Sequence, residues 1–253
     1  MTLRAILLFT LAATLTACVT TGDVDPLKTD KGRDEARDAY IQLGIGYLQQ
    51  GNAGRAKVPL KKALELDPSN ADANVALAMV FQSEMENELA DQHFRKAVSA
   101  RSDDSRILNN YGSFLFEQKR YPEAMERFKQ ASADTMYQER SRVFENMGLV
   151  ALMMKQRDQA KGYFERALRL NARQSTALLE MASLSFEDKN YVESKSYYDS
   201  YMAVSEPNAR SLLLGTRLAR AFEDHDKAAT LGLQLKRLYP GTPEYQQFVL
   251  EQR

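Results

Sequence analysis

A motif of about 34 residues recurs along most of this 253-residue chain and constrains its fold more than any other feature. The first copy runs from Arg37 to Asn70 and contains two sets of apolar or small residues at helical spacing. Gly51 and Asn52 separate the two sets, and Pro68 ends the second. Each copy therefore predicts two short amphipathic helices joined by a tight turn. The sets in the first copy are Tyr40, Leu43, Gly44 and Tyr47, and then Ala56, Leu60, Ala63 and Leu64.

Five further copies keep this pattern of small and bulky residues, with an extra pair of residues before the fourth copy. Their period and small-residue positions resemble the tetratricopeptide repeat. That resemblance implies an all-α chain, folded as a right-handed superhelical solenoid of about six repeats over residues 37–242. Residues 243–253 are then expected to form a short C-terminal capping helix. The further copies span residues 71–104, 105–138, 141–174, 175–208 and 209–242.

The charge balance and the histidine content argue against several classes of function. Lysine plus arginine and aspartate plus glutamate both total 34, so no net charge directs the protein toward nucleic acid or an anionic surface. The two histidines, His93 and His225, lie in different repeats, so we expect neither a metal site nor a histidine-based catalytic centre. No convergent set of polar residues suggests an enzyme. We therefore expect a non-enzymatic protein with no cofactor and no small-molecule substrate.

Residues 1–17 predict a secretory signal peptide, because Arg4 precedes an apolar run that is too short to span a bilayer. The segment Leu15-Thr16-Ala17-Cys18 resembles the bacterial lipobox, which implies cleavage before Cys18 and acylation of that residue. The alternative is an ordinary signal peptide with an incidental cysteine. However, Cys18 is the only cysteine of the chain and lies where a lipobox requires one. Val19 follows it, and by the sorting convention of bacterial lipoproteins this favours a lipid-anchored, periplasm-facing protein of the outer membrane.

Residues 18–36 connect this anchor to the repeats and are expected to form a flexible tether. From Val19 to Ala36 the chain mixes glycine, proline, threonine and charged residues, with almost no apolar ones. A flexible coil of about 18 residues reaches roughly 20–25 Å on average. The repeats are therefore expected to lie just off the membrane surface.

In the tetratricopeptide repeat family the first helix of each repeat lines a concave groove, and the resemblance implies such a groove here. Packing does not require apolar residues at groove positions, so their presence predicts a docking site for an apolar peptide or helix. The alternative is that the tether or the curvature of the solenoid covers them. Groove asparagines could bond the backbone of an extended peptide, although asparagine also serves as a solvated or capping residue. The predicted groove residues are Ile41, Ile45, Leu48, Val75, Met79, Asn109, Asn110, Phe116 and Asn146.

Two segments narrow the resemblance: YIQLGIGYLQQGNAGRAKVPLKKALELDP at residues 40–68, and ILNNYGSFLFEQKRYPEAMERFKQASADTMYQERSRVFENMGLVAL at residues 107–152. With the lipobox and the six repeats, they resemble the PilF/PilW family of type IV pilus biogenesis lipoproteins. The resemblance implies a pilotin, which binds subunits of the outer-membrane secretin and promotes their outer-membrane localisation and multimerisation. The alternative is another outer-membrane repeat lipoprotein that scaffolds barrel assembly or cell-wall enzymes.

Overall fold

The computed structural model describes residues 26–252, and within that range the chain consists of thirteen α-helices and one 3-10 helix, without a strand. The all-α prediction is confirmed. Cys18, the predicted signal peptide and the first part of the predicted tether lie outside the described residues. None of the described helices is long and apolar enough to cross a membrane. The elements are η2 (Pro26–Lys28), α2 (Asp30–Gln49), α3 (Ala53–Leu66), α4 (Ala71–Ser83), α5 (Asn87–Ala100), α6 (Ser105–Glu117), α7 (Tyr121–Ala133), α8 (Arg140–Met153), α9 (Arg157–Leu170), α10 (Ser175–Glu187), α11 (Tyr191–Met202), α12 (Ala209–Ala221), α13 (His225–Leu238) and α14 (Pro243–Leu250).

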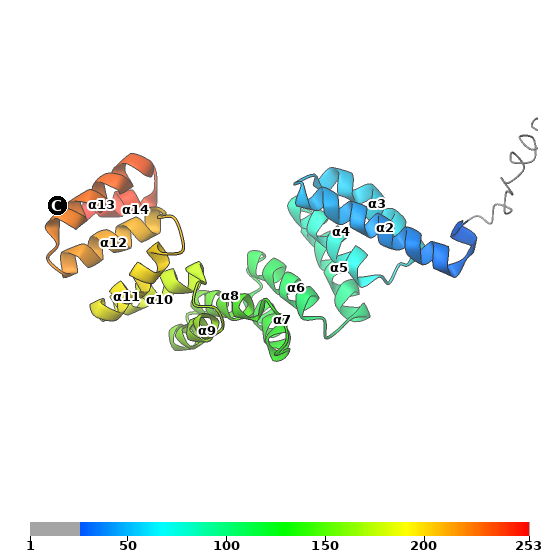
Figure 1. Ribbon diagram of the computed structural model, residues 1–253, viewed down its shortest axis with the longest axis horizontal. Coiled ribbons are helices and arrows are strands. Elements are labelled where there is room, and N and C mark those ends of the chain that lie inside the picture. Colours follow the sequence, from blue (N-terminus) through cyan, green and yellow to red (C-terminus); the bar gives the residue numbers. More distant parts are fainter. Residues whose placement is uncertain (1–25, 253) are drawn as a thin grey trace, which may run out of the picture. The chain divides into compact units, whose positions relative to one another are not determined.

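Consecutive helices form six pairs, from α2–α3 to α12–α13, and α14 follows the last pair (Figure 1). Glycine lets the two helices of a pair approach closely. A Cβ added to Gly112 would lie 2.7 Å from the ring of Phe128, and one added to Gly148 would lie 2.4 Å from the ring of Phe164. Both distances are far inside van der Waals contact, so only glycine fits opposite these aromatic rings. The alternation of small and bulky residues in the motif therefore reflects helix-to-helix packing.

The chain divides into two compact units, one ending at His93 and one beginning at Phe94. In the first unit, Ile41 of α2 packs with Ala63 of α3 and Ala73 of α4. Gly44 faces Leu60, where an added Cβ would lie 2.5 Å from the leucine side chain. The first pair of helices thus repeats the small-against-large contact with a leucine in place of an aromatic residue.

In the core of the second unit, several second helices each contribute one large buried aromatic residue, which packs among residues of the first helices. Phe94 stacks on Tyr111 with their ring centroids 5.3 Å apart, and Phe114 lies 5.2 Å from Phe94 on another side. Phe128 and Phe164 are fully buried at the corresponding position of the next two repeats. Further along the chain, one cluster of buried residues joins the fifth and sixth repeats: Leu178, Leu179, Ala182, Tyr198, Tyr201, Leu214 and Leu218.

The turn inside each repeat has a recurring geometry along the chain, because one residue in it adopts a left-handed backbone. The first of these residues is Gly51, with φ of 71°, and the others are not glycine. They follow one another at a spacing of 34 residues, except that 36 residues separate Lys119 from Lys155, across the extra pair of residues before the fourth repeat. The left-handed residues after Gly51 are Met85, Lys119, Lys155, Lys189 and Glu223.

The C-terminal helix α14 packs on α12 and α13 of the last repeat. Gly232 of α13 occupies the repeat position that holds Phe128 and Phe164 in earlier repeats. The ring of Phe248, from α14, lies where a side chain at position 232 would be, 2.4 Å from an added Cβ. In addition, Arg217 Nε donates to Glu251 Oε1 at 3.1 Å. The last repeat therefore receives its large aromatic residue from the following helix.

Two predictions about the start of the repeats are wrong. Residues 30–36, expected to be flexible, form the first turns of α2, because the Thr29 hydroxyl caps the helix by accepting from the Gly32 N–H at 3.0 Å. Leu43, which belongs to the apolar set of the first predicted amphipathic helix, is 49% exposed, although such a set is expected to face the core. At the same repeat position Tyr111 is buried against Phe94 of the preceding repeat. Leu43 belongs to the first repeat, so no preceding repeat covers it.

Candidate protein-binding surfaces

The predicted groove of the first unit contains both buried and accessible residues. Ile41 and Val75 are only 4% and 3% exposed, so they belong to the core and offer no surface to a partner. Their assignment to the groove is therefore wrong. Ile45 and Leu48 of α2 are partly exposed, and Met79 of α4 is 43% exposed. Because α2 and α4 are in contact, these three side chains form the accessible apolar part of the groove.

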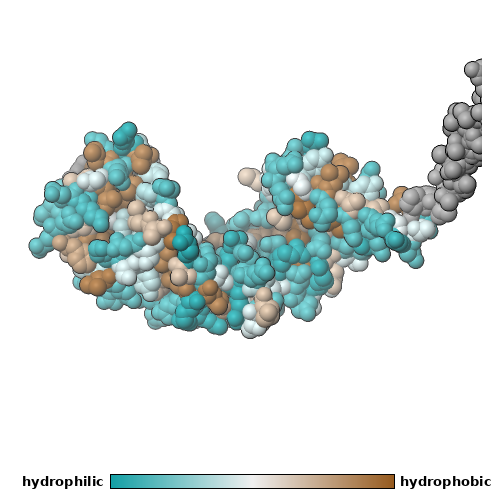
Figure 2. Space-filling model, in the orientation of Figure 1, coloured by the Kyte–Doolittle hydropathy of each residue, from teal (hydrophilic) through white to brown (hydrophobic). Residues whose placement is uncertain are grey.

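Ile41 and Val75 are buried for the same physical reason. Both occupy the fifth position of their repeat, and Ile41 packs directly on Ala63 and Ala73. Small alanines let α2, α3 and α4 approach closely, so a side chain at this position is enclosed between helices. The residues one turn further along α2 and α4 are not enclosed in this way. Hydrophobic side chains reach the molecular surface as separate patches among hydrophilic ones (Figure 2).

Two of the four predicted groove residues of the second unit, Phe116 and Asn146, line a hollow of about 250 Å³, whereas Asn109 and Asn110 do not. Asn146 Nδ2 of α8 donates to Asn109 Oδ1 of α6 at 3.3 Å, so the two predicted asparagines bond each other. Asn109 is buried and Asn110 is partly exposed. Phe116 lines the hollow and packs against Tyr121, with their ring centroids 5.7 Å apart. The residues that line this hollow are Ser113, Phe116, Glu117, Phe128, Asn146 and Leu149.

This hollow combines an apolar floor with polar groups at its side. Phe116 and Leu149 are partly exposed and offer apolar surface, and Asn146 retains a carbonyl oxygen that the bond to Asn109 does not use. Its size suits a single apolar side chain rather than a cofactor. Within residues 26–252 no group of three or more histidine, cysteine, aspartate or glutamate residues is placed to hold a metal ion.

Polar contacts between the later repeats were not anticipated from the sequence. Glu180 of α10 is buried and forms a two-point ion pair with Arg210 of α12, in which Arg210 Nη2 lies 2.7 Å from Glu180 Oε2. Glu145 Oε2 accepts from the Ala177 N–H at 3.0 Å, and burial raises the pKa of Glu145. Glu180 occupies the same repeat position as the predicted groove residues Asn110 and Asn146, so extending that prediction to the fifth repeat would have identified it.

The tyrosine-rich helix α11 borders a larger hollow of about 800 Å³ in the second unit. Tyr198 and Tyr201 are buried and serve packing, and burial raises the pKa of Tyr198 to about 12. Tyr191 and Tyr197 instead line the hollow beside Phe222. Both are partly buried, and Tyr197 also packs against the core cluster that joins the fifth and sixth repeats.

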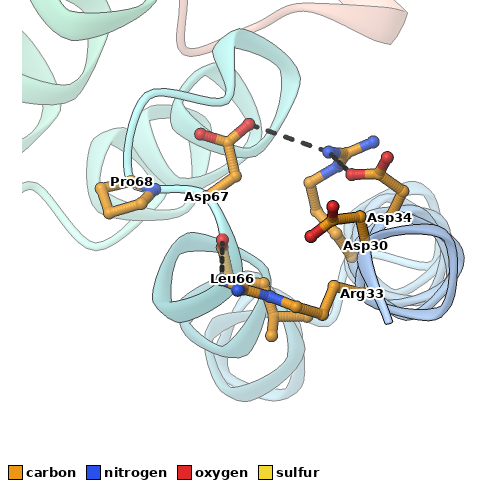
Figure 3. Close-up of a pocket in the computed structure, with 7 residues that line it drawn as sticks. Asp30, Arg33, Asp34, Leu66, Asp67 and Pro68 are labelled. Carbon is orange, nitrogen blue, oxygen red and sulfur yellow. Dashed lines mark hydrogen bonds and ion pairs between the residues drawn. The ribbon is translucent and has the colours of Figure 1, made fainter. Parts of the chain in front are cut away.

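A charged pocket of about 420 Å³ lies between the start of α2 and the turn that follows α3 (Figure 3). Arg33 Nη2 donates to the Leu66 carbonyl at 3.4 Å, and Arg37 Nη1 lies 2.6 Å from Asp34 Oδ1 and 4.0 Å from Asp67 Oδ2. The hydroxyl of Ser69, which donates to Asp67, lowers the pKa of that carboxyl. The arginines and carboxylates that line this pocket therefore pair mainly with one another and with the backbone. We therefore assign the pocket a structural role in holding the extended start of α2 on the first repeat.

Comparisons with known proteins agree with this geometry. Models of the tetratricopeptide repeat match residues 38–70 and 86–136. The type IV pilus assembly protein PilF of Pseudomonas aeruginosa is 63% identical over 251 residues, which cover 99% of this chain and all of that protein.

Solved structures give the same result. The structure of Pseudomonas aeruginosa PilF matches with a TM-score of 0.84 and covers 87% of this chain and 99% of that one, at 63% identity. The structure of PilW, a widely conserved type IV pilus biogenesis factor, matches with a TM-score of 0.73 at 28% identity, and covers 84% of this chain and 98% of that one. The architecture and the length of the match agree, and the chain belongs to the PilF family of type IV pilus assembly proteins, with a role in type IV pilus biogenesis.

Proposed function

We propose that this protein is a pilotin: a non-enzymatic lipoprotein that binds the secretin of the pilus machine and promotes its localisation and multimerisation in the outer membrane. The observation that carries the proposal is the match to PilF, which extends over nearly the entire length of both chains. A similarity that includes all six repeats and the N-terminal segment supports a shared role of the whole protein rather than a shared fold alone.

The proposed mechanism needs an anchor and a recognition surface. The acyl chains on Cys18 supply the anchor, because several acyl chains give stable membrane attachment where one gives only reversible binding. The accessible side chains of Ile45, Leu48 and Met79 supply an apolar surface on the first unit. A secretin subunit bound there is concentrated at the membrane, so that its assembly with other subunits becomes effectively local.

The anchor is tested by replacing Cys18 with alanine. We expect the repeats to remain folded, because all six copies of the motif lie within residues 37–242, whereas secretin multimers should no longer accumulate in the outer membrane. The measurement is membrane fractionation, with secretin multimers detected on gels. Normal multimers in the outer membrane of the Cys18→Ala strain would contradict the anchoring mechanism.

The recognition surface is tested by Met79→Asp, alone and combined with Ile45→Asp. Met153→Asp is the matched control, because Met153 is also exposed and also lies on the first helix of its repeat. The Met79 variant should capture less secretin from solubilised membranes, with a melting temperature close to that of the control. Peptides of a barrel-assembly complex in place of secretin among the captured proteins would favour a scaffold for barrel assembly.

A further inference from the structure

The outer face of the first repeat carries two cross-helix pairs, each of a cation and an aromatic ring. Arg55 of α3 lies over the ring of Tyr47 at 4.5 Å and also donates to its hydroxyl at 3.2 Å. Lys62, two turns further along α3, lies over the ring of Tyr40 at 5.4 Å. Leu43 and Val58 lie midway between these pairs on their helices and are 49% and 63% exposed. We call the face formed by Tyr40, Leu43, Tyr47, Arg55, Val58 and Lys62 the N-terminal face.

This composition distinguishes the first repeat from the others. An outer face that remains in water should be polar, because terminal repeats of solenoids need a polar outer surface. Val58 is apolar, but every other copy of the motif has a polar residue or glycine at this position. The residues at the equivalent position are Gln92, Glu126, Gly162, Ser196 and Thr230. An exposed valine beside an exposed leucine therefore indicates a surface that is covered by something outside the chain.

The charges around these apolar residues indicate what covers it. Helix α3 carries Arg55, Lys57, Lys61 and Lys62 but only one acidic residue, Glu65. Lys57 is bound to Glu84 at 2.5 Å, whereas the cations of the N-terminal face contact aromatic side chains and have no acidic partner among the described residues. Tyrosine rings, short aliphatic side chains and long cationic ones together are typical of protein surfaces at the headgroup level of a bilayer.

The length of chain outside the structure adds a second argument. Eight residue steps separate Cys18 from Pro26, where the described chain begins. However those residues are folded, eight steps span at most about 28 Å. If Cys18 is acylated, as proposed above, Pro26 remains within that distance of the acylated residue, and the first repeat follows Pro26 directly in the chain. Binding of the face to the same bilayer is then favoured by a high effective concentration.

We propose that the N-terminal face docks on the anionic phospholipid surface into which Cys18 is anchored. Leu43 and Val58 enter the headgroup layer, the rings of Tyr40 and Tyr47 lie at its edge, and Arg55 and Lys62 pair with lipid phosphates. The inference rests on the proposed lipid anchor. It adds a defined orientation: α2 and α3 lie along the membrane instead of moving freely on a tether.

Tryptophan fluorescence can test this, because the chain contains no tryptophan. Val58→Trp places a single tryptophan on the face, which we call the face reporter. Val192→Trp, on another second helix where the valine is 77% exposed, is the matched control reporter.

Acylated full-length protein is reconstituted in vesicles of phosphatidylethanolamine and phosphatidylglycerol. We expect the face reporter to show blue-shifted emission that spin-labelled lipids quench near the headgroup, and the control reporter to show neither effect. Leu43→Asp with Lys62→Glu should abolish both effects at the face reporter.

Each other outcome has a definite meaning. A face reporter that behaves like the control reporter would overturn the proposal. A blue shift that requires added secretin and is insensitive to quenching lipids would also overturn it, and would identify the face as a protein-docking surface. Protein that fails to float with the vesicles would contradict the lipid anchor instead. Unacylated protein that carries the face reporter, added to the same vesicles, should then still show the shift, with binding about fivefold weaker for each cation removed.

Discussion

At the C-terminal end of the repeats, α14 covers the last helix pair, whereas at the N-terminal end the outer face of the first pair is exposed. Gly232 receives the ring of Phe248 from α14, so the missing aromatic residue of the sixth repeat is supplied within the chain. Leu43 of the first repeat, at a position that is buried in the following repeats, receives no such cover from the described residues. Both ends face the same problem, because a helix pair buries its second face only against a neighbour.

The difference shows how one repeat design serves two purposes. Where the chain supplies its own neighbour, the terminal face contributes to stability. Where it does not, the exposed apolar residues contribute little to stability and are available for an external surface. The following predictions compare an interior repeat, the covered end and the exposed end.

The largest effect is expected in an interior repeat. Met147 occupies the same repeat position as Leu43, but only 3% of it is exposed. Met147→Ala should lower the free energy of unfolding by about 3 kcal/mol, because it leaves a cavity in a packed core. Leu43→Ala is the matched control and should change it by less than about 0.5 kcal/mol. Urea unfolding measures the free energy of unfolding of both variants. An equal decrease in the two would show that the exposed end is packed like the interior.

The covered end should give an intermediate effect. Phe248→Ala removes the ring that fills the space beside Gly232 and should cost about 2 kcal/mol, less than for a fully buried phenylalanine. Leu250→Ala on the same helix is the control, since Leu250 is 64% exposed. Hydrogen exchange should show faster exchange in α13 for the Phe248 variant alone. Unchanged protection of α13 would mean that α14 does not stabilise the last repeat.

The smallest effect is expected at the contact between α8 and α10, which lies in interior repeats. Burial raises the folded-state pKa of Glu145, so ionisation of this carboxyl opposes folding once the pH exceeds its ordinary range. Glu145→Gln keeps an oxygen that accepts from the Ala177 N–H and removes the charge. The variant should be more stable at pH 7, by about 0.5 kcal/mol, and the difference should disappear below a pH of about 4. A difference that is constant with pH would assign the effect to packing.

The sequence predicted the repeats because their small and bulky positions are set by contacts within one helix pair. Gly148 against Phe164 is such a contact, and it follows from the sequence of a single repeat. The exposure of Leu43 depends on the absence of a preceding repeat, which the motif alone does not express. The burial of Ile41 and Val75 depends on how closely neighbouring repeats pack, which one repeat alone does not determine. The predicted tether extended too far along the chain, because the cap at Thr29 begins α2 earlier than the motif does.

The left-handed residue in each turn has a practical consequence. In the second unit Lys119, Lys155, Lys189 and Glu223 are exposed, and each belongs to a different repeat. Because their backbone is fixed and their side chains have no role in packing, a fluorophore or cross-linker attached there would report on one repeat at a time. Cysteines introduced at these positions would compete only with Cys18 for the reagent, so the chain offers one labelling site for every repeat of this unit.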